Sequence, residues 1–194
     1  MDGHPVPKTR KWRGHTFSET RYSVAVWLER ELPKVTGDVV NVAAGGWPIP
    51  KQLLTNPGLK SYTTYDQKHY GDGVNPVDKY GDVHNMPPEW ANKWDAVICN
   101  QAIECFKNPF KAMDELYRIL KPGGVLYIDA PFNYRWFGDE AWPNKKPKAH
   151  RVYDYWRISK DGWEELTKKF SNVKIEHSGP NVWDAYNFMV KAIK

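Results

Sequence analysis

The sequence predicts an α/β protein built on a doubly wound, mostly parallel sheet with one antiparallel strand and helices on both faces. Short apolar runs alternate with helical patterns through most of the chain, which is typical of βαβ units. Two alternating runs then follow one another near the C-terminus, which indicates an antiparallel pair near one edge of the sheet. With 194 residues the chain is long enough for one well-buried domain and too short for two of average size.

The first fifteen residues are polar and basic, so we expect a basic N-terminal arm over residues 1–15 and a single domain over residues 16–194. Thr16 and Glu19 are placed as a capping box ahead of the helical pattern RYSVAVWLEREL. Pro33 ends that helix, because its ring cannot continue it. The next run, DVVNVA, is continuous and apolar, as expected of a buried parallel strand.

A glycine turn, AAGGWPIP, follows this first strand, and Pro50 opens a short helix at its end. The second strand is KSYTTYD, which ends on Asp66. Residues 67–93 contain many turn signals and are predicted to be mostly irregular. Only fifteen residues separate Asp66 from Asp82, so the usual helix and strand of this region must be shortened.

WDAVICN is the third clear strand, and the helix NPFKAMDELYRILKPGG follows it with Asn108 as its N-cap and Gly123 at its end. Its apolar face is predicted to hold Phe110, Met113, Leu116 and Leu120. GVLYIDAP is the fourth strand, and a long aromatic and basic loop over residues 132–157 comes after it. SKDGWEELTKKF is a helix capped by Ser159, and NVKIEHSG and DAYNFMVKAIK form the closing strands.

Composition excludes several classes of protein. Cys99 and Cys105 lack CxxC spacing, so we expect neither a disulfide framework nor a metal site. No apolar run is long enough to span a bilayer, and the first residues lack a signal segment, so a cytoplasmic location is expected. The net charge of +5 lies largely in PKTRKWR and NKKPKAHR, which is consistent with solvated lysines or with an anionic partner.

Ligands of doubly wound sheets bind at the carboxyl ends of the parallel strands. The first strand is followed by Ala43-Ala44-Gly45-Gly46, whose small side chains let the backbone approach a ligand. The second strand ends on Asp66, about twenty residues further on, where a carboxylate can accept hydrogen bonds from a ribose. Asp82 precedes the third clear strand, and Asn100 ends that strand. Polar and small residues at successive strand ends, in this order along the chain, indicate a site for an adenosine-containing ligand.

The stretch from Val39 to Gly124 resembles the class I S-adenosylmethionine-dependent methyltransferases. The resemblance rests mainly on WDAVICNQAIECFKNPFKAMDELYRILKPGG, and YDYWRISKDGWEELTKKF is similar to a later segment of some of these enzymes. It implies a Rossmann-like, seven-stranded, three-layer α/β/α sheet, shortened between its second and fourth strands. It also implies S-adenosylmethionine as cofactor.

Carried over position by position, the resemblance assigns cofactor contacts to eleven residues. These are Asn41, Ala43, Ala44, Gly45 and Gly46 for the methionine part, Asp66 and Gln67 for the ribose, Asp82 and Val83 for the adenine, and Asn100 and Gln101 beside the transferred methyl.

The first strand and the glycine turn after it depart from the family pattern at three positions. Asn41 stands where the family has an acid and offers an uncharged acceptor instead. Ala43 replaces the first glycine, which costs little if its φ stays negative. Trp47 replaces the third, and we expect its side chain to point away from the cofactor, as a lid.

The acceptor side is expected after the fourth strand, in the long loop. His150 is the first choice for a general base because imidazole titrates near neutrality, and Asp154 is the second. Tyr134, Trp136, Tyr155 and Arg157 are the expected substrate contacts. The alternative is that His150 is an exposed loop residue and that the DYWR segment has only a structural packing role.

The predicted activity is methyl transfer to an oxygen or nitrogen of a small-molecule or glycan-type acceptor. The main alternative is a non-catalytic protein that keeps the fold and binds the cofactor or its product. Nucleic acid is disfavoured as a substrate, because NQAI replaces the Asn/Asp-Pro-Pro-Tyr/Phe motif of amino-methylating DNA enzymes. A nicotinamide dehydrogenase is disfavoured because Trp-Pro-Ile-Pro follows Gly46. The chain is expected to be a monomer or a homodimer.

Overall fold

A computed structural model describes residues 9–45, 49–67, 77–134 and 153–194. Its centre is a seven-stranded sheet in the order β5-β4-β3-β6-β7-β9-β8. The strands are β3 (Gly37–Val42), β4 (Leu59–Asp66), β5 (Lys79–Tyr80), β6 (Trp94–Asn100), β7 (Leu120–Pro131), β8 (Ser171–Ser178) and β9 (Asn187–Ile193). β9 is antiparallel to both of its neighbours, and the other pairs are parallel, so the predicted sheet is confirmed.

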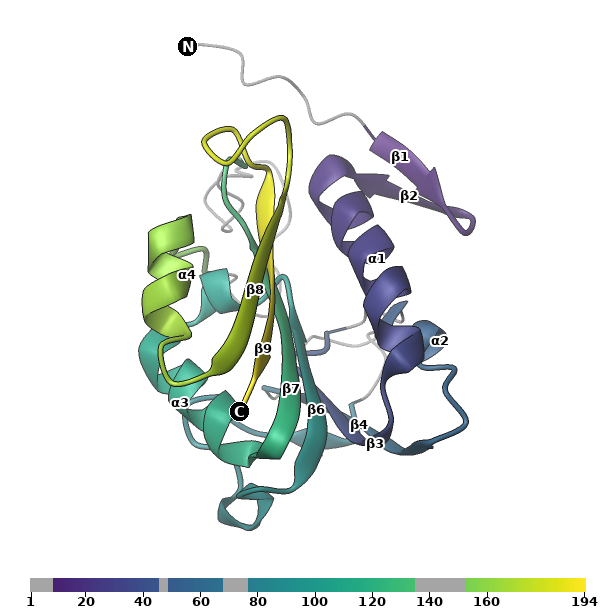
Figure 1. Ribbon diagram of the computed structural model, residues 1–194, viewed down its shortest axis with the longest axis vertical. Coiled ribbons are helices and arrows are strands. Elements are labelled where there is room, and N and C mark those ends of the chain that lie inside the picture. Colours follow the sequence, from purple (N-terminus) through teal and green to yellow (C-terminus); the bar gives the residue numbers. More distant parts are fainter. Residues whose placement is uncertain (1–8, 46–48, 68–76, 135–152) are drawn as a thin grey trace, which may run out of the picture.

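Helices cover both faces of this sheet, which gives the three predicted layers (Figure 1). α1 (Glu19–Glu31) and α2 (Ile49–Leu53) lie on one face, while α3 (Pro109–Ile119) and α4 (Lys160–Leu166) lie on the other. The sheet has one hydrophobic core on each face, because successive side chains along a strand point to opposite faces. Val39 and Ile98 pack with α1, whereas Val40 and Val97 pack with α3 and α4.

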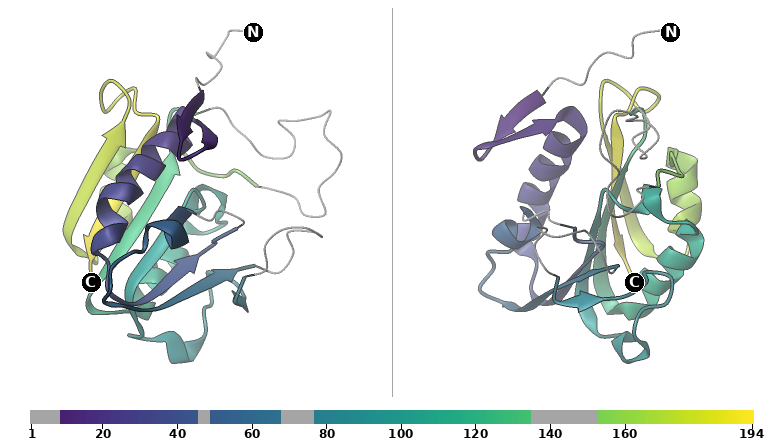
Figure 2. Two further views of the ribbon diagram at one scale, coloured as in Figure 1. Left: turned by 90° about the vertical axis from the view of Figure 1, so that its right-hand side faces the viewer. Right: turned by 180° about the vertical axis from the view of Figure 1, so that it is seen from behind.

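Part of the expected arm is a hairpin. β1 (Thr9–Trp12) and β2 (His15–Ser18) pair with each other and lie beside α1 (Figure 2). Trp12 is buried against α1, and its indole Nε1 donates to Glu29 at 2.9 Å. The hairpin forms because it buries this aromatic side chain, a tertiary contact that the polar composition of the segment does not reveal.

Two predicted helix ends are corrected. α1 begins after Ser18, whose hydroxyl accepts from the N–H of Arg21, because Thr16 is already paired within the hairpin. α3 keeps Asn108 as its cap but ends at Ile119, because Leu120 already pairs with Trp94 in the sheet. Gly123 is therefore part of β7, and Phe110 is exposed.

The region between β4 and β6 is short, as predicted. Over residues 77–93 the structure contains the two residues of β5 and a single 3-10 turn, η2 (Pro88–Trp90). Two further 3-10 turns are η1 (Leu32–Lys34) and η3 (Ile103–Cys105). Within the described ranges, no helix is long and apolar enough to cross a membrane, and no three His, Cys, Asp or Glu side chains are placed to hold a metal ion.

Candidate functional site

The sheet brings the predicted cofactor residues to one edge. Val42 is in register with Tyr65, and Asn100 is in register with Asp129, so the carboxyl ends of β3, β4, β6 and β7 lie next to one another. The carboxyl ends of these strands carry the turn after β3, Asp66 and Asn100. The order of the strands therefore assembles groups that are far apart in the sequence.

The turn after β3 is held in a left-handed conformation. Ala43 has a φ of 53° and Gly45 a φ of 51°, and the N–H of Ala44 donates to the carbonyl of Tyr65 at 3.3 Å. The condition under which alanine would cost little here, a negative φ, is therefore not met. An alanine here carries backbone strain, of a kind that clusters at functional sites. Gly46 and Trp47 lie outside the described residues.

Asp66 is buried at the end of β4 and is held by the backbone of two loops. One carboxylate oxygen accepts from the N–H of Gly45 at 2.7 Å, and the other accepts from the N–H of Gln67 at 2.7 Å. Gln67 thus contributes through its backbone, while its side chain is exposed. The ionised carboxylate is an acceptor-only group, as a ribose diol requires.

Asn41 lies within β3, ahead of this turn. Its side chain is buried on the α1 face, where its Nδ2 donates to the hydroxyl of Tyr62 at 3.0 Å. Burial raises the pKa of Tyr62 to about 12, so that hydroxyl stays protonated. The amide of Asn41 therefore ties β3 to β4.

Asp82 follows β5 beside Asp66, since Tyr80 pairs with Asp66. Its side chain is exposed, and its Oδ1 accepts from the backbone N–H of His84 at 2.9 Å. Val83 is buried in the same core as Tyr65, whose hydroxyl donates to the Asp82 carbonyl at 3.2 Å. A Cβ on Gly81 would lie 2.1 Å from that hydroxyl, so a larger residue here would displace the Tyr65 ring.

A buried network of amides and a carboxylate closes the ends of β6 and β7. Asn100 Nδ2 donates to Asp129 at 2.6 Å, and the Gln101 side chain donates to the other oxygen of Asp129. Burial raises the pKa of Asp129 to about 7, although these two bonds oppose the shift. Asn100 Oδ1 is buried without a partner in the part of the chain that the structure describes. Gln101 has a φ of 49°, a second strained residue at a strand end.

Glu104 is fully buried, and neither of its carboxylate oxygens has a hydrogen-bond partner within the described residues. Burial raises its pKa to about 8, and nearby Asp129 and Asp154 add to the shift. Its backbone carbonyl accepts from the N–H groups of Tyr155 and Trp156. Glu104 therefore anchors the segment that carries the expected substrate residues.

The structure brings three of the predicted acceptor-side residues together. Arg157 pairs with the fully buried carboxylate of Asp154 at 2.7 Å, and its Nε donates to the carbonyl of Tyr134 at 3.3 Å. Tyr155 is exposed and stacks on Tyr153 with ring centroids 5.3 Å apart. His150 and Trp136 lie outside the described residues.

Sequence reasoning did not assign a role to Asp129, Glu104 or His84. Two of them carry a recognisable signal, because Asp129 interrupts the apolar strand GVLYIDAP and Glu104 stands in the apolar stretch AIEC. The partners of His84 are visible only after folding, since Asp82 and Asn108 come to it from different segments.

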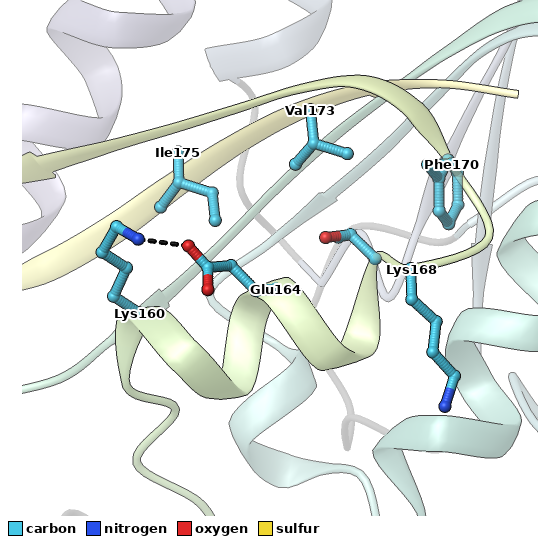
Figure 3. Close-up of a pocket in the computed structure, with 7 residues that line it drawn as sticks. Lys160, Glu164, Lys168, Phe170, Val173 and Ile175 are labelled. Carbon is cyan, nitrogen blue, oxygen red and sulfur yellow. Dashed lines mark hydrogen bonds and ion pairs between the residues drawn. The ribbon is translucent and has the colours of Figure 1, made fainter.

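A groove between α4 and β8 is a separate feature (Figure 3). It is lined by Lys160, Glu164, Thr167, Lys168, Phe170, Val173 and Ile175. Lys160 and Glu164 form an ion pair along α4, on the helix side of the groove. Because β8 is at the opposite edge of the sheet from β4 and β5, this groove has no part in the site around Asp66.

Comparisons with known proteins agree with the fold. Residues 60–128 match the family model described as "Methyltransferase domain". The chain is 27% identical over 113 residues to human thiol S-methyltransferase TMT1A, covering 50% of this chain and 43% of that protein. It is 28% identical over 109 residues to rat thiol S-methyltransferase TMT1B, covering 52% and 42%. The chain thus spans less than half the length of these curated relatives.

Solved structures show the same architecture at low sequence identity. A putative methyltransferase from Bacillus halodurans matches with a TM-score of 0.59 and 17% identity, covering 89% of this chain and 99% of that one. Phosphoethanolamine N-methyltransferase 2 of Haemonchus contortus, in complex with S-adenosyl-L-methionine, matches with a TM-score of 0.61 and 16% identity, covering 89% and 52%.

Proposed function

We propose that this chain, whose residues 60–128 match a methyltransferase-domain model, transfers a methyl group from S-adenosylmethionine to a small-molecule thiol. The observation that carries the proposal is the buried carboxylate of Asp66, which Gly45 and Gln67 hold at the end of β4, beside Asp82.

The chemistry of the site fits the cofactor. Asp66 is an acceptor for ribose hydroxyls, and Asp82 with Val83 is placed for the adenine. Asn100 Oδ1 is buried and unpartnered in the described structure, so it can accept from a donor such as the ammonium of the methionine part. Ala43 to Gly46 are the remaining proposed contacts. S-adenosylmethionine supplies an electrophilic methyl bound to a positively charged sulfur.

The protein's task in such a displacement is alignment of the acceptor and, where needed, removal of its proton. Gln101 and Asn100 are the proposed neighbours of the transferred methyl, and Asp129 holds both side chains in place. Tyr134, Trp136, Tyr155 and Arg157 are the proposed acceptor contacts. His150 is the proposed base, and Asp154 serves chiefly to hold Arg157.

The names of the two curated relatives support a thiol as the acceptor. A thiolate is the reactive nucleophile and needs little assistance once its proton is lost. An oxygen or nitrogen of a small or glycan-type acceptor is the competing proposal, and it draws support from the stacked Tyr153 and Tyr155, since aromatic rings bind sugars and flat molecules.

Two measurements test the proposal. Calorimetry with S-adenosylmethionine and S-adenosylhomocysteine should show binding of both, and binding of neither would exclude the enzyme. Methyl transfer is then measured with matched thiol, amine and hydroxyl acceptors of one carbon skeleton. We expect turnover with the thiol; turnover with the amine or hydroxyl alone would select the competing acceptor class, and binding without any turnover would favour a non-catalytic protein.

A further inference from the structure

His84 joins two parts of the site that are separate in the sequence. Its Nδ1 lies 2.7 Å from Oδ1 of Asp82, and its Nε2 accepts from the backbone N–H of Asn108 at 3.3 Å. The ring also packs edge-on against Phe106, with centroids 6.0 Å apart. One imidazole therefore connects the loop after β5 to the start of α3.

These contacts define one tautomer. The N–H of Asn108 can only donate, so the Nε2 atom facing it must carry a lone pair. The proton of a neutral imidazole is then on Nδ1, where it is donated to Asp82. The backbone N–H of His84 donates to the same oxygen, so Oδ1 of Asp82 receives two hydrogen bonds from one residue.

The two bonds orient the carboxylate. With Oδ1 engaged, rotation of the Asp82 side chain is restricted, and Oδ2 has no hydrogen-bond partner within the described residues. The side chain is exposed beside the end of β4, on the side of the sheet where Asp66 lies. Partial burial would raise the pKa of Asp82, but the hydrogen bonds from His84 bring it below its ordinary value, so the group stays an acceptor.

We propose that His84 is a positioning residue for base recognition: it presents Oδ2 of Asp82 to the exocyclic amino group of adenine. This inference rests on the proposed binding of an adenosyl cofactor and adds a specificity mechanism to it. A carboxylate oriented in this way accepts from the adenine amino group and repels the carbonyl oxygen that replaces it in hypoxanthine.

The test compares dissociation constants for S-adenosylhomocysteine and S-inosylhomocysteine, measured by calorimetry on the full chain. The native protein should prefer the adenosyl compound at least tenfold. His84→Ala should reduce that preference at least threefold. His84→Asn, whose amide nitrogen can replace Nδ1, should keep it within twofold, whereas His84→Gln, which has no donor at that place, should behave as His84→Ala does.

The outcomes separate this inference from the proposed function. Native protein that binds neither compound overturns both. Binding of both compounds equally well, or an unchanged preference in His84→Ala, overturns the role of His84 and leaves the methyltransferase proposal standing. Circular dichroism checks folding; if His84→Ala does not fold, equal preferences in His84→Asn and His84→Gln overturn the inference.

Discussion

The carboxylate of Asp66 accepts a hydrogen bond of 2.7 Å from the backbone N–H of Gly45, which joins the end of β4 to the turn after β3. Two elements that the sequence separates by about twenty residues thus form one unit, the pair expected to hold a nucleoside. The first prediction below tests Asp66 at the end of β4, and the second tests the turn after β3.

Asp66→Asn should weaken binding of S-adenosylhomocysteine about tenfold to a hundredfold. The amide nitrogen would face the N–H of either Gly45 or Gln67, donor against donor, so one of these hydrogen bonds is lost. The variant also lacks the charge that strengthens a bond from a ribose hydroxyl, and hydrogen bonds to a charged acceptor contribute about 1.5–3 kcal/mol. Asp78→Asn is the matched control, because Asp78 is an exposed acid bonded to Thr64 on the same strand. Calorimetry compares the two variants, and equal affinities would remove Asp66 from the cofactor site.

Ala43→Gly should stabilise the protein by up to about 1 kcal/mol. The left-handed conformation costs an alanine roughly 1–2 kcal/mol, which exceeds the added chain entropy of glycine, about 0.5–1 kcal/mol. Ala44→Gly is the control, since Ala44 does not have a positive φ and should lose stability. Urea unfolding measures both, and a destabilised Ala43→Gly would contradict the observed turn conformation.

Stability should fall as the pH rises from about 5 to 8. Burial raises the pKa of Glu104 to about 8 and that of Asp129 to about 7, so the folded protein keeps protons that the unfolded chain releases above its ordinary carboxyl pKa. Each group then lowers the free energy of unfolding by at most about 1.4 kcal/mol per pH unit.

Glu104→Gln should flatten this dependence, because an amide does not titrate. Urea unfolding at pH 5, 6.5 and 8 gives the slope for both proteins. Carboxyls with a lowered pKa, such as Asp95, lose their stabilising contribution only as the pH falls below about 5, so they do not interfere. Identical slopes in the variant and the native protein would mean that Glu104 is ionised throughout this range.

His150→Ala should lower turnover while the affinity for S-adenosylhomocysteine holds. A general base contributes about 10²–10⁴-fold to rates where the acceptor must lose a proton, and less where a thiolate forms in solution. Initial rates across pH 6–9, with binding measured separately, check this. Unchanged turnover on the accepted substrate at pH 6 and at pH 9 would remove His150 from the mechanism.

Much of the architecture could be predicted because strands and helices carry local patterns. The run WDAVICN predicts β6, and the Asn108 cap predicts where α3 begins. The errors are at places where a distant partner overrides the local pattern. Thr16 joins a hairpin that Trp12 anchors on α1, and Leu120 leaves the helical pattern to pair with Trp94.

The strand-end part of the proposed cofactor site could be selected in the same way, since the strand-end rule depends only on strand order, whereas the individual contacts come from the family resemblance. Asp66 and Asp82 lie at neighbouring strand ends, as that rule requires. The states of the buried acids could not be predicted, because a pKa depends on burial and on neighbours that converge only in the folded chain. For that reason the sequence does not reveal that Asp129 receives hydrogen bonds from two side-chain amides, or that Glu104 receives none from the residues that the structure describes.

Periodicity, caps and turn residues are local properties, so the order of elements, the doubly wound sheet and the positions of the strand-end carboxylates follow from the amino-acid sequence. Three features depend on contacts between distant segments: the positive φ of Ala43, the pairing of Asp154 with Arg157 and the link from Asp82 through His84 to Asn108. Hydrogen bonds of this kind act over about 3 Å, and only folding brings such partners within that distance.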